Sequence, residues 1–406
     1  MVNKESSVSI FSSRPPLKVV LINTWSIVNA KGGTEKVFCD MANALAQRGH
    51  HVTAICVDKN EGLPGFPIDR RVRFINAYYS TRLPFLLTKP IINLRSISIF
   101  PEKRRSKRAD LSANALAYQL NQVLSNLASP DVLISFQPTT TYAIKKLVGK
   151  AVPLVTMLHT KPTVFLSHTL PSAIKSAVAS SSIVQVLRPE FIADVHAIIP
   201  SANIKVIPNA VPQFQASSSL KNKIIINIAR ITEDKGQLLL VEAFAKLKEK
   251  FPEWNIELWG ETHVDPKYTE KVKSAINSRG LTNHVRLCGT TDDVSSQLKR
   301  ASIFAFPSRH EGFPLALTEA MSMGLPAIGW VKCTSVNTLI KDGDNGLLCE
   351  DTPESLANAL SRLMMDESVR IRLGNTAKED MKEYAPSQVW AQWEKLLLSL
   401  SDSHQQ

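Results

Sequence analysis

Two glutamates separated by seven residues mark the segment whose residue types and spacing best suit chemistry. Glu311 and Glu319 lie in the run 309–326, where Gly-Phe-Pro predicts a helix start directly after Glu311 and places Glu319 two turns inside the helix. The first amides of a helix lack partners within it, and the helix dipole favours negative charge there. The backbone N–H groups of Gly312, Phe313 and Leu315 therefore predict an anion site.

Such a site suits a nucleotide diphosphate sugar, with phosphates at the helix end, Glu311 facing the sugar and Glu319 accepting from the ribose hydroxyls. Spacing alone is weak, because two glutamates at this distance are common and Ser-Arg-His-Glu also fits a plain capping turn. The full string resembles the E-x7-E signature of retaining glycosyltransferases of family 4 (group 1). With the motifs below, the resemblance covers roughly residues 18–400, and it implies the two-domain GT-B fold.

A glycine pair lies between the first predicted strand and the first predicted helix. Gly32 and Gly33, in Lys-Gly-Gly-Thr-Glu, allow a ligand to approach the backbone closely, although a tight strand-to-helix turn needs the same residues. The dinucleotide pattern G-x-G-x-x-G is absent. The resemblance implies that this loop lies over the donor diphosphate, near the acceptor, which assigns Gly32 and Gly33 to donor binding.

Two cations follow the predicted strand 224–228. Arg230 and Lys235 leave the carboxyl end of this strand, where fixed positive charge offsets the charge that grows on a departing diphosphate. A surface lysine alone is usually only solvated, but R-x4-K-G resembles the family pattern. His159 ends another predicted strand and could be an ordinary loop residue. The resemblance implies that it contacts the donor sugar, so the predicted catalytic residues are Glu311, Arg230, Lys235 and His159.

A metal site is not expected. Asp342-Gly343-Asp344 imitates the D-x-D motif of metal-dependent glycosyltransferases, but its setting in Lys-Asp-Gly-Asp-Asn-Gly is ordinary turn chemistry. Arg230, Lys235 and the helix end would hold the diphosphate without a metal. No cofactor is expected either.

Positive charge is concentrated in the first half of the chain. The net charge is +12, yet residues 1–208 carry +14 and residues 209–406 carry −2. Residues 70–108 hold eleven basic residues and one acid, interleaved with apolar side chains. This mixture favours an anionic membrane surface over a solvated loop or a core-facing helix, and nucleic acid is disfavoured because stacking aromatics are lacking. The predicted membrane and acceptor residues are Arg82, Lys89, Arg95, Lys103, Arg104, Arg105, Lys107 and Arg108.

The organisation predicts two doubly wound α/β domains facing across a cleft. Apolar strand patterns near 18–23, 51–57, 72–75, 132–136, 153–157 and 183–187 alternate with helical patterns at 34–48, 110–127, 139–148 and 189–197, and residues 77–108 stay unassigned. The pattern restarts after a Pro- and Ser-rich linker, with strands at 224–228, 255–259, 285–287, 302–306, 326–328 and 347–349 and helices at 236–250, 267–279, 292–300 and 335–341. Three helices, 353–365, 367–384 and 387–400, end the chain. The expected domains are a disordered lead-in (1–16), an acceptor-side domain (17–208), a linker (209–222), a nucleotide-sugar domain (223–385), and a terminal helix with its tail (386–406) that crosses back to the first domain.

Compartment signals point to the cytoplasm. Five scattered cysteines form no C-x-x-C pair, which is typical of buried free thiols in a reducing compartment. No apolar run long enough to span a bilayer occurs, and the polar N-terminus does not resemble a signal peptide. We expect a peripheral protein on the inner face of the cytoplasmic membrane.

The resemblance implies a retaining transferase that moves a hexose from a nucleotide diphosphate sugar, most simply UDP-hexose, to a lipid-linked or polysaccharide acceptor in lipopolysaccharide or exopolysaccharide synthesis. A non-hydrolysing nucleotide-sugar epimerase is the alternative enzyme and would convert the donor without an acceptor. A silent nucleotide-sugar-binding protein is the third possibility, against which the intact Glu311, Glu319, Arg230 and Lys235 argue. The sequence leaves open the sugar, the nucleotide, the acceptor, the linkage and the oligomeric state.

Overall fold

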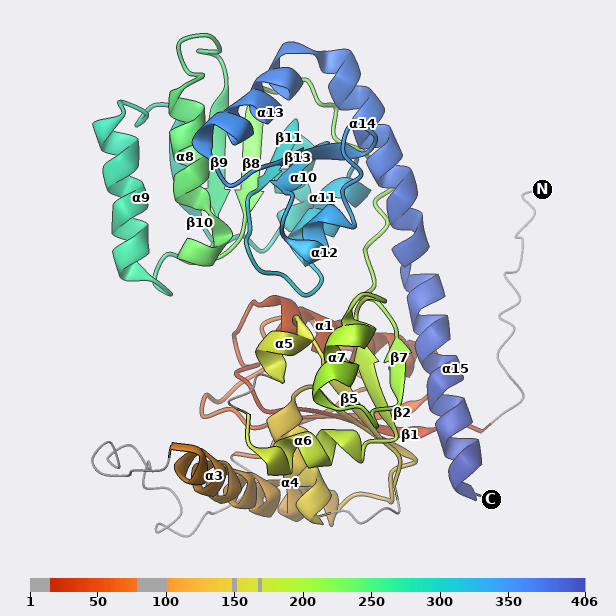
Figure 1. Cartoon of the computed structure of the whole chain (residues 1–406). Helices are drawn as coiled ribbons and strands as arrows, with labels where there is room; N and C mark the ends of the chain where they lie inside the picture. Colours follow the sequence, from red (N-terminus) through yellow and green to blue (C-terminus); the bar gives the residue numbers. More distant parts are fainter. Residues whose placement is uncertain (1–14, 79–100, 148–151, 167–169, 406) are drawn as a thin grey trace, which may run out of the picture. The chain divides into compact units, whose positions relative to one another are not determined.

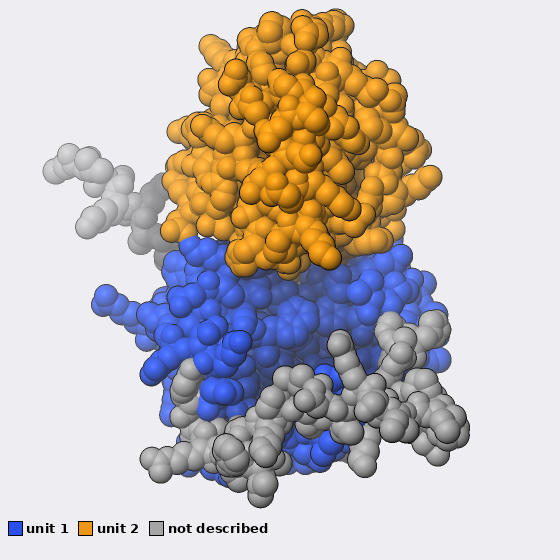
Figure 2. Space-filling model, turned by 90° about the vertical axis from the view of Figure 1, so that its left-hand side faces the viewer, with its two compact units in different colours: residues 1–207, 390–406 blue, residues 208–389 orange. Residues whose placement is uncertain are grey.

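The computed structural model describes residues 15–78, 101–147, 152–166 and 170–405, without the side chains of 101–107 and 405. The chain divides into two compact units, which are coloured separately in Figure 2. Unit 1 comprises residues 1–207 and 390–406, and unit 2 comprises residues 208–389. Each is a parallel sheet surrounded by helices, as Figure 1 shows, so the expected pair of doubly wound α/β folds is confirmed.

Unit 1 is built on a seven-stranded sheet with the order β3-β2-β1-β4-β5-β6-β7, and all its strand pairs are parallel. A parallel sheet is covered on both faces, which explains why strands such as β1 are buried almost throughout. The strands are β1 (Lys18–Asn23), β2 (His51–Cys56), β3 (Arg73–Asn76), β4 (Val132–Ser135), β5 (Leu154–Leu158), β6 (Ile183–Val186) and β7 (Ile204–Val206). The helices are α1 (Gly33–Gln47), α3 (Pro101–Leu124), α4 (Pro138–Leu147), α5 (Pro162–Phe165), α6 (Ser172–Ala179) and α7 (Phe191–Ile198).

Unit 2 repeats the design with a six-stranded parallel sheet, ordered β10-β9-β8-β11-β12-β13. Its strands are β8 (Ile224–Ile228), β9 (Asn255–Trp259), β10 (Val285–Gly289), β11 (Ile303–Phe306), β12 (Ala327–Trp330) and β13 (Gly346–Cys349). Its helices are α8 (Gln237–Ala245), α9 (Pro266–Ser278), α10 (Val294–Arg300), α11 (Leu315–Ser322), α12 (Thr334–Asn337), α13 (Pro353–Met365) and α14 (Glu367–Asp380), with 3-10 turns η1 (Glu233–Lys235) and η2 (Met381–Tyr384). A large core packs α8, α9 and α13 onto the sheet.

Both sheets change winding direction at one place. In unit 1 the chain proceeds from β1 to β2 and β3 on one side, and to β4 and the later strands on the other; in unit 2 the same switch lies between β8 and β11. Loops that follow the two central strands diverge to opposite faces, so ligands bind in the crevice at the carboxyl ends of these strands. The topology therefore directs attention to the residues after β1 and β4 and to those after β8 and β11.

The last helix, α15 (Pro386–Gln405), belongs mainly to unit 1. Trp390 and Trp393 are buried, as expected for a core stripe, and the Glu394 carboxylate lies 3.5 Å from Arg48 Nε and 3.4 Å from His50 Nε2. In the part of the chain that the structure describes, no helix combines the length and the apolar character needed to cross a bilayer.

Candidate active site

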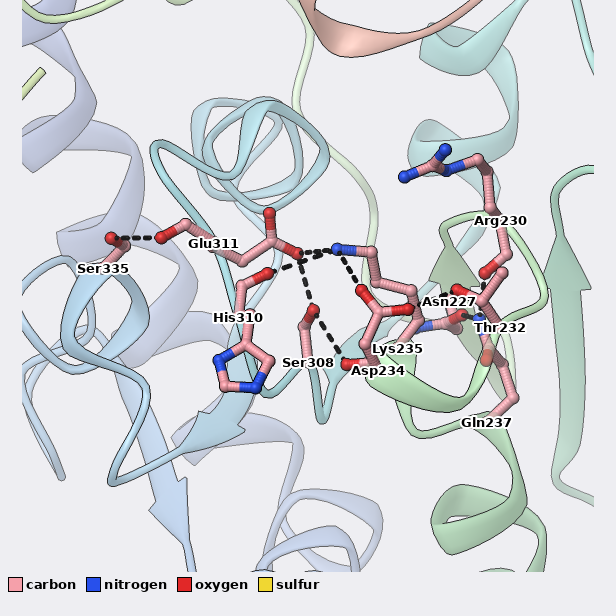
Figure 3. A network of polar contacts seen from close by, with 10 residues as sticks. All are labelled: Asn227, Arg230, Thr232, Asp234, Lys235, Gln237, Ser308, His310, Glu311 and Ser335. Carbon is pink, nitrogen blue, oxygen red and sulfur yellow. Dashed lines mark hydrogen bonds and ion pairs between the residues drawn. The ribbon is translucent and has the colours of Figure 1, made fainter. Parts of the chain in front are cut away.

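The switch point of unit 2 gathers the charged residues singled out in the sequence. Arg230 and Lys235 follow β8, whereas Ser308 and Glu311 follow the neighbouring strand β11. Figure 3 shows Lys235, Ser308 and Glu311 meeting at the ends of the two strands, whereas the Arg230 guanidinium extends away from them. β8 and β11 are far apart in the sequence but pair as neighbours in the sheet. The sheet topology therefore brings these residues together.

Lys235 and Glu311 form the central ion pair of this cluster. The Lys235 ammonium donates to Glu311 Oε1 at 2.8 Å and to the His310 carbonyl at 3.3 Å, and it lies 3.2 Å from Asp234 Oδ2. The two side chains are only 13% and 15% exposed. Burial lowers the pKa of Lys235, but the Glu311 and Asp234 carboxylates outweigh burial and raise this pKa above its usual value. Lys235 is therefore firmly charged.

Glycine is required directly after Lys235. Gly236 has φ 72°, and a Cβ at this position would lie 2.5 Å from the Pro307 carbonyl oxygen. Only glycine tolerates both the left-handed conformation and this close approach. The 3-10 turn η1 and Gly236 thus displace the start of α8 and leave Lys235 outside that helix, directed at Glu311 (Figure 3).

Glu311 keeps one carboxylate oxygen available. Its Oε1 accepts from both Lys235 and the Ser308 hydroxyl, the latter at 2.6 Å, while Oε2 has no partner among the described residues. Ser335 Oγ donates to the Glu311 carbonyl at 2.8 Å and so fixes its backbone (Figure 3). Glu311 is thus held in place on one side and free to accept a hydrogen bond on the other.

Arg230 is an exposed cation in this cluster. No carboxylate of the described chain pairs with its guanidinium, which extends away from the ion pair in Figure 3. Its backbone is fixed, because Gln237 Nε2 donates to the Arg230 carbonyl at 2.9 Å. A planar guanidinium with all its donors available is well suited to bind phosphate oxygens.

The start of α11 supplies unpaired amides beside Glu311. The helix begins at Leu315, and Pro314 provides no side-chain cap. Within the described residues, no group accepts from the backbone N–H of Gly312, Phe313 or Leu315. The position of Glu319 differs from the sequence prediction: it is the fifth residue of α11, one turn into the helix, because residues 312–314 lie outside it. Glu319 is only 7% exposed.

The other predicted residues lie at the carboxyl edge of the sheet in unit 1. Gly32 is the N-cap of α1 and Gly33 is its first residue. His159 directly follows β5, and its ring stacks on Phe136 with centroids 4.8 Å apart. The residue as a whole is half-buried, but both ring nitrogens are shielded and have no partner among the described residues.

Burial lowers the pKa of His159 to about 3. The neutral ring has one donor and one acceptor nitrogen. His159 is therefore suited to hydrogen bonding with a ligand hydroxyl and not to carrying charge at neutral pH.

The predicted membrane residues are only partly described. Arg82, Lys89 and Arg95 lie outside the described residues. Lys103, Arg104, Arg105, Lys107 and Arg108 occupy the first two turns of α3, and Arg108 is exposed.

The Asp342-Gly343-Asp344 segment forms a turn. Asp342 Oδ1 accepts from the Leu348 amide at 2.8 Å. Among the described residues, no cluster of three metal-ligating side chains occurs. Ser308 and Asp234 were missed as members of the site. Ser308 had one signal, since it follows the strand that precedes the signature.

Comparisons with known proteins identify the family of this chain. Residues 31–213 match the model for Glycosyltransferase Family 4, and residues 212–380 match the model for Glycosyl transferases group 1. The chain therefore belongs to the glycosyltransferases, with a family 4 first half and a group 1 second half.

Individual relatives are consistent with this membership. An exopolysaccharide phosphotransferase of Streptomyces coelicolor is 28% identical over 95% of this chain, which spans only 41% of that relative. An α-1,4-N-acetyl-D-galactosaminyltransferase of Campylobacter jejuni, named for a PP-undecaprenol-linked glycan, is 26% identical over 92% of this chain and 96% of its own length. A TarM variant of S. aureus, solved with fondaparinux, α-GlcNAc-glycerol and UDP, superposes with a TM-score of 0.73 at 15% identity, covering 94% of this chain and 99% of its own. The fold is that of the GT-B glycosyltransferases.

Proposed function

We propose that this glycosyltransferase is a retaining enzyme that moves a hexose from UDP-hexose to a lipid-linked or polysaccharide acceptor. The observation that carries the proposal is the grouping in unit 2 of the paired Lys235 and Glu311, the unpaired Arg230 and the unpaired α11 amides. A diphosphate needs cations and N–H donors, and a sugar needs a fixed carboxylate beside them. This grouping supplies all three within one unit.

In the proposed complex each residue has a separate role. Arg230 and the amides of Gly312, Phe313 and Leu315 bind the diphosphate oxygens, and Glu319 accepts from the ribose hydroxyls. The free Oε2 of Glu311 accepts from a sugar hydroxyl, and His159 contacts the sugar with its neutral ring. The Lys235 contact to the His310 carbonyl is its longest at 3.3 Å, so we expect a phosphate oxygen to replace it.

The transfer step proceeds by attack on the face from which the leaving group departs. The acceptor oxygen forms its bond to the anomeric carbon as the bond from that carbon to the β-phosphate oxygen breaks. The acceptor proton passes to the departing phosphate, and UDP leaves with the electron pair. Arg230 and Lys235 stabilise the charge that develops on the diphosphate. Glu311 binds and orients in this scheme, because Lys235 and Ser308 already engage its Oε1.

We propose that no metal ion is needed. The diphosphate charge is met by Arg230, Lys235 and the α11 amides, and Asp342 is engaged in a turn. Transfer activity that persists at full rate in excess EDTA supports this part, and activity restored only by Mg²⁺ or Mn²⁺ contradicts it.

We also propose that the basic start of α3 holds the enzyme to an anionic membrane surface on the cytoplasmic side. Five cations in the first two turns of a helix oppose the helix dipole, which favours acidic residues there. An external anionic surface offsets this unfavourable arrangement. The enzyme would then bind a lipid-linked acceptor at the membrane surface that carries it.

The test of the function is a donor screen. UDP-, GDP- and ADP-hexoses are incubated with the protein and with glycan or lipid-linked acceptors, and the released nucleotide and the anomeric configuration of the product are measured. We expect release of UDP and an α-linked product from an α-linked donor. Inverted configuration contradicts the retaining mechanism, and epimerisation of the donor without an acceptor contradicts the transferase.

A further inference from the structure

An exposed aromatic pair lies at the carboxyl edge of the sheet in unit 1, and neither ring is among the proposed donor contacts. Trp25 follows β1, and Phe165 ends the short helix α5 that follows β5. Their rings stack with centroids 5.7 Å apart and planes 9° from parallel. Trp25 is nevertheless 42% exposed. Since Phe165 covers one face of the indole, the exposed area lies on the opposite face and the edge.

The backbone around Trp25 is fixed by hydrogen bonds from three directions. The Trp25 N–H donates to Asn23 Oδ1 at 3.0 Å, and the Thr24 N–H donates to Gln137 Oε1 at 3.1 Å. The Ile27 N–H donates to Asp58 Oδ2 at 2.8 Å. Gln137 follows β4 and Asp58 follows β2, so the loops after the neighbouring strands hold the loop that carries Trp25.

A second brace supports the same loop from the side of β2. The Gly65 amide donates to the Ile27 carbonyl at 3.0 Å. A Cβ on Gly65 would lie 2.1 Å from the Ala30 carbonyl oxygen, so only glycine permits this approach. Trp25 is thus an exposed large aromatic on a rigid loop, which is typical of a binding surface: it presents a large contact area with little conformational entropy to lose.

The surroundings indicate the chemistry of the ligand. A flat aromatic ring accepts a planar or nearly planar apolar face, and such a face is formed by the C–H groups of a pyranose. This edge is polar: the Trp25 N–H donates to Asn23 Oδ1, and the fully buried Asn23 has an unpartnered Nδ2. A sugar stacked on Trp25 presents hydroxyls to this polar edge, whereas a bare lipid tail would cover polar groups without giving them hydrogen-bond partners.

We propose that Trp25 and Phe165 form a platform on which a pyranose ring of the acceptor stacks. This inference rests on the proposed function, which places the donor nucleotide and diphosphate in unit 2, uses His159 for the donor sugar, and assigns no donor contact to Trp25 or Phe165. It narrows the acceptor to a molecule that already carries a sugar, as opposed to a polyprenyl phosphate or a polyol without one.

The test compares Trp25→Ala and Trp25→Phe with the wild type. Tyr118→Ala is the matched control, since Tyr118 is an exposed aromatic of unit 1 on α3, 38% exposed. The probes are the methyl glycopyranosides of glucose, galactose and N-acetylglucosamine. Binding is followed by saturation-transfer NMR, and transfer is followed by steady-state kinetics with varied glycoside.

We expect Trp25→Ala to raise the acceptor KM about three- to tenfold, the effect of one aromatic contact, with kcat and UDP affinity unchanged. Trp25→Phe keeps a ring and should lie near the wild type, as should Tyr118→Ala. A melting temperature equal to that of the wild type shows that Trp25→Ala remains folded. If Trp25→Ala unfolds, the test uses Trp25→Phe instead. The platform then predicts a small rise in its acceptor KM and NMR saturation-transfer signals on one face of the sugar.

Four results would overturn the platform. An acceptor KM unchanged in Trp25→Ala is the first, and absence of binding of every glycoside to the wild type is the second. A weakened UDP affinity would show that the ring stacks on a nucleobase, and a loss of vesicle binding alone would show that it enters a membrane. Failure of the proposed function is separate: it would appear as no transfer from any donor while glycoside binding still depended on Trp25.

Discussion

Lys235 Nζ lies 2.8 Å from Glu311 Oε1 and joins the end of β8 to the loop after β11 across 76 residues of sequence. Asp234 also forms an ion pair with the Lys235 ammonium, so this lysine is paired with two carboxylates. Arg230, by contrast, forms no ion pair with a carboxylate of the described chain, although its charge contributes to lowering the pKa of Asp234. The two cations of the site therefore differ in role: Lys235 holds Glu311 in place, and Arg230 is the charge available to a ligand. The first two predictions follow from this difference.

Arg230→Ala should slow transfer without weakening the fold. Removal of one preorganised donor to developing charge lowers kcat by about 100-fold. The free energy of unfolding should stay within about 0.5 kcal/mol, because the exposed side chain makes no ion pair in the described chain. Arg230→Lys should recover part of the rate but lack the planar fork. Steady-state kinetics and urea unfolding give both quantities, and a large loss of stability with normal kcat would reverse the assigned role.

Lys235→Met should reduce both stability and transfer. It leaves the mostly buried Glu311 carboxylate without its cation, which costs about 3 kcal/mol of unfolding free energy. Lys246→Met is the control, because Lys246 is 48% exposed in its pair with Glu354 and such pairs contribute about 1 kcal/mol or less. Because the pKa of folded Lys235 is raised, the stabilisation is complete at neutral pH and is lost only as the pH rises through that elevated value. Equal losses in the two variants would argue against a special role for this pair.

Glu319→Gln should abolish discrimination for the ribose hydroxyls. The wild type is expected to bind UDP about tenfold more tightly than 2′,3′-dideoxy-UDP, as befits lost hydrogen bonds to a carboxylate. The variant should bind both nucleotides with similar, weaker affinity while kcat changes little. Calorimetric titration with both nucleotides measures this, with Glu354→Gln as an exposed control in the same unit. Retained discrimination in Glu319→Gln would place the ribose elsewhere.

His159 should make the protein less stable as the pH falls. The unfolded chain takes up a proton near pH 6.5, whereas the folded chain resists protonation until about pH 3 because the ring is buried. A His pKa lowered by folding means that stability is lost below pH 6.5. Between pH 7 and pH 5 this amounts to about 2 kcal/mol. Urea unfolding should show that the loss of unfolding free energy between pH 7 and pH 5 is about 2 kcal/mol smaller in His159→Phe than in the wild type. His196→Phe is the control, because His196 is an exposed histidine of unit 1.

Charge reversal at the start of α3 should release the protein from anionic vesicles. Replacement of Lys103, Arg104, Arg105, Lys107 and Arg108 by Glu removes about 1 kcal/mol of attraction per residue. Sedimentation with phosphatidylglycerol vesicles measures binding, and transfer to soluble acceptors should stay unchanged. The control reverses Lys267, Lys271 and Lys273, which are exposed on α9 of unit 2. Vesicle binding that survives the first set discards the membrane role of this segment.

The sequence predicted most strands because a buried parallel strand has a short, dense apolar run. The prediction for β8 agrees with the structure at both ends, and those for β1 and β9 do as well. Helix ends were less predictable. The helix expected at 236–250 spans Gln237–Ala245, since Gly236 adopts the left-handed conformation and the helix ends before Lys246. Strand β7 and helix α6 were missed because three and eight residues carry too little periodicity.

Helix α3 shows a different limit. Its first nine residues, rich in lysine and arginine, lack an apolar stripe, so the expected start at 110 lies well inside the helix that begins at Pro101. In the site, the motifs identified Arg230, Lys235 and Glu311, but not which carboxylates Lys235 contacts. That pairing depends on β8 lying beside β11, which local sequence does not encode. The stacking of the His159 ring on Phe136, which directly follows β4, likewise depends on the order of the strands.

The central claim is that the diphosphate of a UDP-sugar binds to the cations and amides of unit 2. A crystal structure of the full chain with UDP tests it most directly. The account predicts phosphate oxygens within hydrogen-bonding distance of the Arg230 guanidinium and of the amides at Gly312, Phe313 or Leu315, with the ribose on Glu319. UDP bound at any other place, or this site left empty while UDP occupies the protein, would contradict it.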